Sequence, residues 1–162
     1  MQRQPRAADA LPSLEEVADL DRARITIEME DGTRLTARLF AFEAPTNAWR
    51  FARLAGAGYF DGLTFHRVAP NFVLQGGSPN ANEYSGDGPF SRDELGLRYN
   101  WRGTIGLSTR GRDTGDAQLF INLVDNVRLD HEYTIFGLIT SDLAAIHDIV
   151  EGAVIRRIRV DM

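Results

Sequence analysis

The chain has 162 residues, of which 43% are hydrophobic and 25% are charged, and its formal net charge at pH 7 is -5. This length and composition predict one globular domain with a sizeable core, and the acidic balance argues against a nucleic-acid partner, which would need a basic face. The absence of cysteine and of lysine excludes thiol catalysis, disulfides, thiolate metal sites and Schiff-base chemistry.

The N-terminal part of the chain shows neither a targeting signal nor a strong structural pattern. No apolar run approaches the roughly 18 residues that a membrane-spanning helix needs, and the apolar core of a secretory signal is absent. We therefore expect a soluble chain with no membrane span, cytoplasmic or exported after processing, and the compartment stays open. Residues 1–22 show a weak helical pattern around Leu14, Val17 and Leu20. We interpret them as an N-terminal extension or linker before a domain of residues 23–162.

A hairpin and a helix are predicted at the start of this domain. Hydrophobic residues alternate over residues 25–29 and again over residues 35–39, and Asp31-Gly32 between them is a strong hairpin signal. From Pro45 onwards, apolar residues recur at helical spacing until Gly56 and Gly58 close the pattern. We expect the apolar face of this helix to cover one end of a sheet.

Residues 64–77 contain the densest group of polar and aromatic side chains. Two extended runs meet at Ala-Pro-Asn, a tripeptide that favours a turn, so a strand, a turn and a strand are predicted. Since side chains alternate along a strand, we expect Phe65 and Arg67 to share one face, and Val73 and Gln75 to do so across the turn. This would gather an arginine, phenylalanine rings and a glutamine near one spot, as in a binding or catalytic site.

The second half of the chain continues a mainly β pattern. Residues 78–103 are rich in Ser, Asn, Gly, Asp and Pro, and because loops of this length are often functional, we expect this one to border a binding groove. Strand-like runs then follow at residues 104–108, 119–123, 134–139 and 154–160.

A second helix is expected between the last two strands. Ser141-Asp142 can cap it, with Leu143, Ile146 and Val150 facing inward and Gly152 ending it. About eight strands and two widely spaced helices do not fit alternating β and α units. They favour an antiparallel β-barrel with capped ends, since closure hides the edges of the sheet.

The familiar catalytic motifs are absent. The sequence has no Gly-rich phosphate loop, no G-x-S-x-G elbow and no H-E-x-x-H pair. Its three histidines, at 66, 131 and 147, give no spacing that supports a metal site. We interpret His66 as a structural residue, because it is expected to point away from Arg67. Neither a cofactor nor a metal is predicted.

Several motifs stand in one order along the chain. The most specific are Phe65-His66-Arg67-Val68, followed by Phe72 and by Gln75-Gly76-Gly77, and then Gln118-Leu119-Phe120-Ile121-Asn122. Leu129-Asp130 and Ile135-Phe136-Gly137 come after them. Together these motifs resemble the cyclophilin family of peptidyl-prolyl isomerases over nearly the whole chain, and residues 102–105 and 120–122 resemble bacterial members in particular.

This resemblance implies a fold, an activity and a set of site residues. The fold would be a closed eight-stranded antiparallel β-barrel capped by two α-helices, and the activity would be cis–trans isomerisation of X-Pro bonds. Carried over position by position, the catalytic arginine is Arg67 and its glutamine partner is Gln75. The substrate groove falls on Phe72, Val73, Phe120 and Leu129 around the proline ring, on Gln118, and on the backbone of Ser108, Thr109 and Arg110.

The chemistry explains why these residue types are needed. Amide resonance gives rotation about a peptide bond a barrier of about 18–20 kcal/mol, and an X-Pro bond isomerises unaided in tens to hundreds of seconds. In the twisted state the prolyl nitrogen becomes pyramidal and gains a lone pair, to which Arg67 can donate a hydrogen bond. Gln75 can orient the guanidinium while aromatic side chains hold the ring.

Two substrate-binding positions depart from the family's pattern. Arg128 stands where many eukaryotic members have a tryptophan that supports cyclosporin binding, so we expect cyclosporin to bind weakly. Tyr133 stands where a histidine often lines the pocket, as in some bacterial members, and activity is expected to be retained.

The predicted partners are proline-containing peptides and unfolded or flexible protein segments. We expect a monomeric domain that assists protein folding. The alternative is a catalytically weak cyclophilin-like module that binds proline peptides or acts as a chaperone. An isomerisation assay on the wild-type protein and on Arg67→Ala would separate the two.

Overall fold

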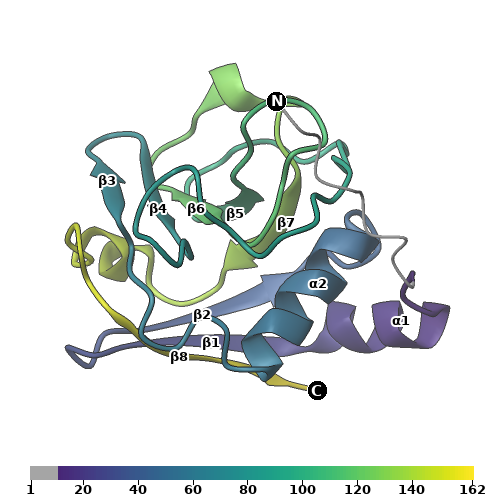
Figure 1. Ribbon diagram of the computed structural model, residues 1–162, viewed down its shortest axis with the longest axis horizontal. Coiled ribbons are helices and arrows are strands. Elements are labelled where there is room, and N and C mark those ends of the chain that lie inside the picture. Colours follow the sequence, from purple (N-terminus) through teal and green to yellow (C-terminus); the bar gives the residue numbers. More distant parts are fainter. Residues whose placement is uncertain (1–10) are drawn as a thin grey trace.

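The computed structural model describes residues 11–162, and the part of the expected extension before residue 11 lies outside the described residues (Figure 1). Eight strands form one sheet in the order β3-β4-β6-β5-β7-β2-β1-β8, and every pairing in it is antiparallel. The eight predicted strands are therefore confirmed. Their bounds are β1 Arg24–Met29, β2 Arg34–Leu39, β3 Arg67–Ala69, β4 Val73–Gly76, β5 Thr104–Leu107, β6 Leu119–Asn122, β7 Ile135–Ile139 and β8 Ile155–Asp161.

The sheet curls but does not close. β3 and β8 stand at the two ends of the strand order, and the segments just before them meet at an isolated antiparallel bridge between Thr64 and Val154. The predicted closed barrel is therefore wrong, and the sheet is an open half-barrel. β3 is only three residues long and begins beyond the bridge, so the two edge strands do not run along each other in a continuous ladder.

The predicted helix that begins at Pro45 is confirmed as α2, Pro45–Gly56. Its first residue is a proline, which is pre-set for a helix start, and its N-cap position offers no side-chain hydrogen bond. Instead the distant carboxylate of Glu94 accepts hydrogen bonds from the N–H groups of Thr46 and Asn47, both at 2.9 Å. The long loop thus supplies hydrogen-bond acceptors for two free N–H groups at the helix N-terminus. The negative charge of Glu94 also interacts favourably with the positive end of the helix dipole.

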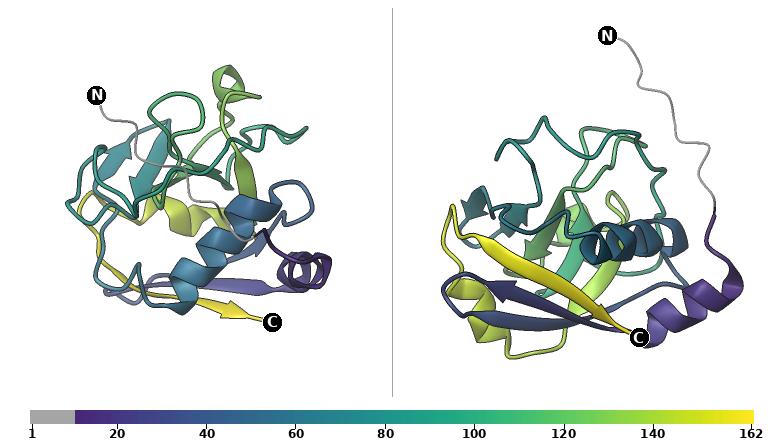
Figure 2. Two further views of the ribbon diagram at one scale, coloured as in Figure 1. Left: turned by 45° about the vertical axis from the view of Figure 1, so that its right-hand side comes forward. Right: turned by 60° about the horizontal axis from the view of Figure 1, so that its bottom comes forward.

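An α-helix also forms in the segment that we expected to be an extension or linker. This helix, α1, spans Leu14–Arg22 and begins with a capping box between Ser13 and Glu16. Val17 and Leu20 are buried in the same core cluster as the sheet and α2, and Figure 2 shows α1 lying beyond the end of the long strands. Residues 14–22 therefore pack against the domain.

The second predicted helix is only a short 3-10 helix, η2, at Leu143–His147. Asp142 caps it as expected, accepting a hydrogen bond from the N–H of Ala144 at 2.9 Å, and Ile146 is buried. Val150, however, is 66% exposed, so its predicted inward position is wrong. The two α-helices of the described chain are thus α1 and α2, and neither of them is long and apolar enough to cross a membrane.

The curled sheet has an inner and an outer apolar surface. The main core lies inside, where Leu74, Ile105 and Ile121 pack in one cluster with Phe51 of α2. A second, smaller cluster of buried residues gathers Phe40, Val73, Phe120 and Ile135. Val73 and Leu74 are consecutive residues of β4, so their side chains point to opposite faces, which places the second cluster on the outer face. This outer cluster forms the base of the candidate site.

Candidate active site

Three neighbouring strands bring the two predicted catalytic residues beside an aromatic ring. In the sheet register, Arg67 of β3 lies opposite Gln75 of β4, and Gln75 lies opposite Phe120 of β6. Directly paired residues share a face of the sheet. A row of one cation, one amide and one ring is therefore fixed by backbone pairing.

Phe65 does not belong to this row, although we expected it to share a face with Arg67. It is fully buried in the main core, and a Cβ at Gly76, on the inner face of β4, would lie 2.8 Å from its ring. β3 begins only at Arg67, so strand alternation does not extend back to residue 65. The predicted common face is wrong for this residue, whereas Val73 and Gln75 do share the outer face.

A cavity of about 210 Å³ opens over the row. One end is apolar and the other is polar. Its lining contains the predicted residues Arg67, Phe72, Val73, Gln75, Ser108, Thr109, Arg110, Phe120, Leu129 and Tyr133, together with Glu83. At the apolar end, the rings of Phe120 and Tyr133 meet edge to face with centroids 5.6 Å apart, an arrangement that aromatic pairs prefer. Ten of the twelve predicted site residues thus line one cavity.

The polar side chains form a directed hydrogen-bond chain. The amide nitrogen of Gln75 donates to Ser108 Oγ at 2.8 Å and to Gln118 Oε1 at 3.2 Å. Its amide oxygen is left to accept a hydrogen bond from Arg67 Nη1, at 3.4 Å. The Arg67 guanidinium also lies 5.9 Å from the centre of the Phe72 ring. Gln75 therefore holds the guanidinium at the edge of the apolar end of the cavity.

The remaining two predicted residues lie outside the cavity lining. Gln118 is buried behind it, and its amide nitrogen donates to the carbonyl oxygens of Asn82 and Ser85 at 3.0 and 2.6 Å. Arg128 is exposed at the rim, where its guanidinium lies 4.5 Å from the centre of the Phe72 ring. Gln118 links Gln75 to the loop, and Arg128 covers one face of an aromatic side chain of the cavity.

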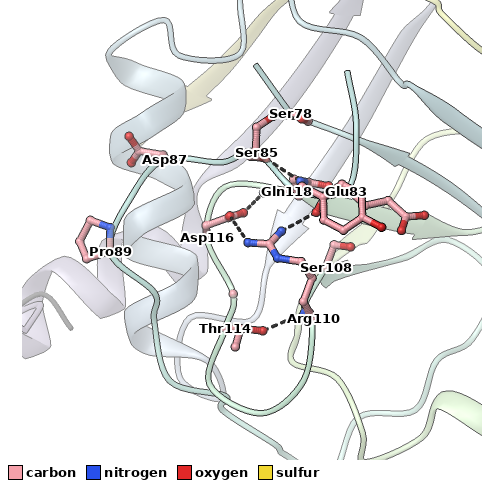
Figure 3. A network of polar contacts seen from close by, with 12 residues as sticks. Ser78, Glu83, Ser85, Asp87, Pro89, Ser108, Arg110, Thr114, Asp116 and Gln118 are labelled. Atoms are coloured by element: carbon pink, nitrogen blue, oxygen red, sulfur yellow. Dashed lines mark hydrogen bonds and ion pairs between the residues drawn. The ribbon is translucent and has the colours of Figure 1, made fainter. Parts of the chain in front are cut away.

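A buried carboxylate, Asp116, connects the loop to the polar end of the cavity (Figure 3). Its two oxygens accept hydrogen bonds from the N–H of Gln118 at 3.0 Å and from Arg110 Nη2 at 3.2 Å. Arg110 also donates to the carbonyl oxygen of Glu83. A Cβ at Gly86 would lie 1.8 Å from Asp116 Oδ2, so only glycine fits there. The predicted loop thus borders the cavity through residues 82–86.

Burial changes the pKa of two side chains near the cavity. Burial, assisted by the neighbouring Arg67, lowers the pKa of His66, and neither ring nitrogen has a hydrogen-bond partner among the described residues. Burial together with the nearby carboxylates of Asp87 and Asp116 raises the pKa of Tyr59 to about 12. Both groups are therefore neutral at pH 7, and Arg67 remains the charged donor that faces the apolar end of the cavity.

Three residues that shape the site were not predicted. Glu83 lines the cavity, Asp116 anchors the loop, and Gly106 of β5 lies opposite Phe120 in the register. A glycine inside a strand signals a close approach, so Gly106 could have been found from the sequence. Asp116 and Glu83 lie in loops, where no pattern of spacing marks them. Within residues 11–162, no group of three or more His, Asp or Glu side chains could hold a metal ion.

The fold and the cavity together define a class of protein: a curled antiparallel sheet that carries a cavity lined by arginine and aromatic side chains on its outer face. Residues 24–161 match the family model described as "Cyclophilin type peptidyl-prolyl cis-trans isomerase/CLD". The chain belongs to this family, as the motifs in the sequence predicted.

The relatives include bacterial proteins of similar length. The chain is 35% identical over 135 residues to a peptidyl-prolyl cis-trans isomerase B of Bacillus subtilis, covering 82% of this chain and 94% of that protein. It is 38% identical over 142 residues to a peptidyl-prolyl cis-trans isomerase of Helicobacter pylori strain J99, covering 84% of this chain and 86% of the relative.

Solved structures support the fold independently. A Cryptosporidium parvum cyclophilin-type isomerase superposes with a TM-score of 0.80 at 23% identity, covering 86% of this chain and 97% of that one. A crystal structure of the same protein in the presence of the dipeptide Ala-Pro gives a TM-score of 0.79 at 22% identity, covering 86% of this chain and 99% of that one.

Proposed function

We propose that this protein catalyses cis–trans isomerisation of X-Pro bonds in peptides and in flexible segments of proteins, and so assists protein folding. The observation that carries the proposal is the position of the Arg67 guanidinium beside Phe72, in one cavity with Phe120. An apolar wall for the proline ring and a fixed cationic donor are the two parts that a catalyst of amide rotation needs.

The apolar end of the cavity holds the proline ring. Phe72, Phe120 and Leu129 contribute its walls, and the buried Val73 contributes to its floor. Because the ring is held while the preceding residue remains free to turn, the X-Pro bond can rotate within the bound complex, and the protein can stabilise the twisted state. No bond to the protein is formed or broken, so the reaction needs neither a nucleophile nor a cofactor.

Arg67 lowers the barrier by recognising the twisted amide. In the planar amide the nitrogen lone pair is delocalised, whereas in the twisted state it is localised and accepts a hydrogen bond. A guanidinium donor that is always charged favours the twisted state over the planar one, which is the condition for catalysis. Gln75 fixes the direction of this donor through its hydrogen bond from Arg67. Each tenfold gain in rate needs about 1.4 kcal/mol of such preference.

The backbone of Thr109 supports binding of an extended peptide. Ser108 N–H is used internally, donating to the carbonyl of Gln118 at 2.9 Å, and Arg110 N–H donates to Thr114 Oγ1 at 2.7 Å. Within residues 11–162, neither the N–H nor the C=O of Thr109 makes a hydrogen bond. A peptide that lies beside Thr109 can pair with both groups, in the manner of an added β-strand.

An isomerisation assay on proline peptides tests the proposal. We expect Arg67→Ala to lower kcat/KM by about 100-fold or more, because electrostatic donors of this kind contribute 10²–10³ in other enzymes. Arg67→Lys keeps the charge but loses the planar fork, so we expect an intermediate rate. Arg157→Ala, an exposed change on β8, is the control and should keep the wild-type rate. Equal background rates for the wild type and Arg67→Ala would contradict the proposal.

The altered rim favours one other function, a module that binds proline peptides with little turnover. Arg128 places a cation over Phe72, next to the ring that the substrate must contact. Titration of the same peptides by NMR distinguishes the two functions. Binding at the cavity without acceleration of exchange between the cis and trans signals would support the binding module over the enzyme.

A further inference from the structure

Glu83 is the only acidic side chain in the lining of the cavity. Among the described residues 11–162, its carboxylate forms no salt bridge and accepts no hydrogen bond. An acidic group beside a binding cavity, with its oxygens free, is available to a ligand that carries the opposite charge.

The neighbouring cations are already engaged. Arg110 pairs with the buried carboxylate of Asp116 at 3.2 Å, and the same guanidinium donates to the backbone carbonyl of Glu83 rather than to its carboxylate (Figure 3). Arg67 donates to Gln75 and faces the Phe72 ring. The negative charge of Glu83 is therefore not neutralised by a direct ion pair.

The backbone on both sides of Glu83 is held in place. Gln118 donates to the carbonyl oxygens of Asn82 and Ser85, and Asn82 Oδ1 accepts hydrogen bonds from the N–H groups of Tyr84 and Ser85 at 2.8 and 3.1 Å. Three side chains therefore hold the backbone around residue 83 by hydrogen bonds: Gln118, Asn82 and Arg110. Glu83 thus presents its carboxylate from an anchored loop.

The direction of the bound peptide follows from the proposed function, on which this inference rests. The prolyl nitrogen joins the ring to the preceding residue, so with the ring at the apolar end and that nitrogen at Arg67, the preceding residues run along the polar lining towards Thr109. Glu83 lies beside this segment, because Arg110, the next residue, donates a hydrogen bond to its carbonyl oxygen. Side chains of an extended peptide alternate, so the second residue before proline points to the same side as the proline ring. That side chain faces the protein near Glu83.

We infer that Glu83 selects substrates with lysine or arginine at the second position before proline. Glu83 is exposed in the free protein, and an ion pair at an exposed site is worth a modest amount. We therefore expect kcat/KM for a lysine peptide to exceed that for a glutamate peptide by about fivefold at low salt. The ratio should approach one at high salt, because the charges are screened.

The test compares capped peptides of the form Lys-Ala-Pro-Phe, Gln-Ala-Pro-Phe and Glu-Ala-Pro-Phe, measuring kcat/KM by NMR exchange and Kd by titration. Glu83→Gln should bring the lysine-to-glutamate ratio to about one, and Glu83→Arg should invert it. Glu132→Gln is the matched control, since it removes the same charge from an exposed side chain outside the cavity lining. It should keep the wild-type ratio.

The outcomes separate the two proposals. An active wild-type enzyme with equal rates and affinities for the three peptides would overturn the role of Glu83 and leave the proposed activity standing. A preference that survives Glu83→Gln would overturn it as well. If no peptide is turned over, the proposed activity is wrong. The ratio of the Kd values for the lysine and glutamate peptides then still shows whether Glu83 distinguishes the charge of the peptide.

Discussion

Gly106 lies opposite Phe120 in the pairing of β5 with β6, and a Cβ at position 106 would lie 2.2 Å from Cζ of the Phe120 ring. The outer end of the ring, Cζ with its two neighbouring carbons, therefore lies against the backbone of β5, in the space that a side chain at position 106 would fill. This contact fixes the depth of the apolar end of the cavity.

Gly106→Ala is expected to push the Phe120 ring into the cavity. We predict a loss of at least tenfold in kcat/KM for proline peptides, together with a loss of about 1–3 kcal/mol in the free energy of unfolding from overpacking. Gly56→Ala is the control, because a Cβ there meets nothing within 4 Å and position 56 ends a helix. Wild-type activity in Gly106→Ala would mean that the ring position does not govern binding.

Asp116→Asn is expected to destabilise the loop. The asparagine oxygen can still accept the hydrogen bond from Gln118 N–H, but the Arg110 guanidinium loses its buried counter-charge. We predict a loss of about 1–3 kcal/mol in the free energy of unfolding, measured by urea denaturation. Adding Arg110→Met should recover part of this loss, since no unpaired cation then remains. An unchanged unfolding free energy in Asp116→Asn would show that the ion pair contributes nothing.

Much of this architecture could be predicted from the sequence, because it is local. Alternating hydrophobic residues identified the strands, and Pro45 with Gly56 identified α2. Ordered motifs identified the residues of the cavity. The closure of the barrel was predicted wrongly because it depends on how far two edge strands overlap, and the length of β3 could not be read from its pattern.

The errors and omissions at the site share a physical cause. The predicted common face of Phe65 and Arg67 failed because alternation holds only within a strand, and β3 begins at Arg67. Glu94 acts through contacts with Thr46 and Asn47, far away in the sequence, and Asp116 acts through contacts with Arg110 and Gln118 in its own irregular loop. Neither kind of contact leaves a periodic signal in the sequence. The tertiary contacts of individual loop residues therefore could not be predicted from the sequence.

The stability of the protein should fall on mild acidification because of His66. Its pKa is lowered in the folded state, chiefly by burial, from an ordinary value of 6.5. The unfolded chain then binds a proton more readily than the folded one, so the contribution of this group is complete above pH 6.5 and is lost as the pH falls below it. We expect the urea midpoint to be lower at about pH 5.5 than at about pH 7.5.

A pair of variants isolates this effect. His66→Phe removes the titrating ring and should flatten the dependence of the urea midpoint on pH between these two values. His147→Gln, a change at an exposed position of η2, should retain it. The same pH dependence in His66→Phe as in the wild type would assign the effect to other groups.

Cyclosporin should bind weakly to this protein and more tightly to Arg128→Trp. Arg128 is exposed and lies over the Phe72 ring, whereas a tryptophan would offer a large apolar surface and an indole N–H donor at the same point. We predict an affinity gain of at least tenfold, measured by fluorescence titration. Arg128→Ala, which removes the cation without adding a ring, should gain less. Submicromolar binding by the wild type would contradict the prediction.

The buried face of α1 should contribute to the stability of the domain and not to its activity. Leu20 is 4% exposed and lies in the main core cluster, and Trp49 of α2 donates a hydrogen bond to Glu16 of α1 at 3.1 Å. Leu20→Ala leaves a cavity between α1 and the sheet, so we expect a loss of about 2–4 kcal/mol in the free energy of unfolding. Leu14→Ala, at a position that is 84% exposed in the same helix, is the control and should cost less than about 0.5 kcal/mol.

At temperatures where both variants are folded, kcat/KM should match the wild type, because α1 contributes no residue to the cavity lining. Equal stability of the two variants would mean that residues 14–22 are an appendage, as an extension or linker would be.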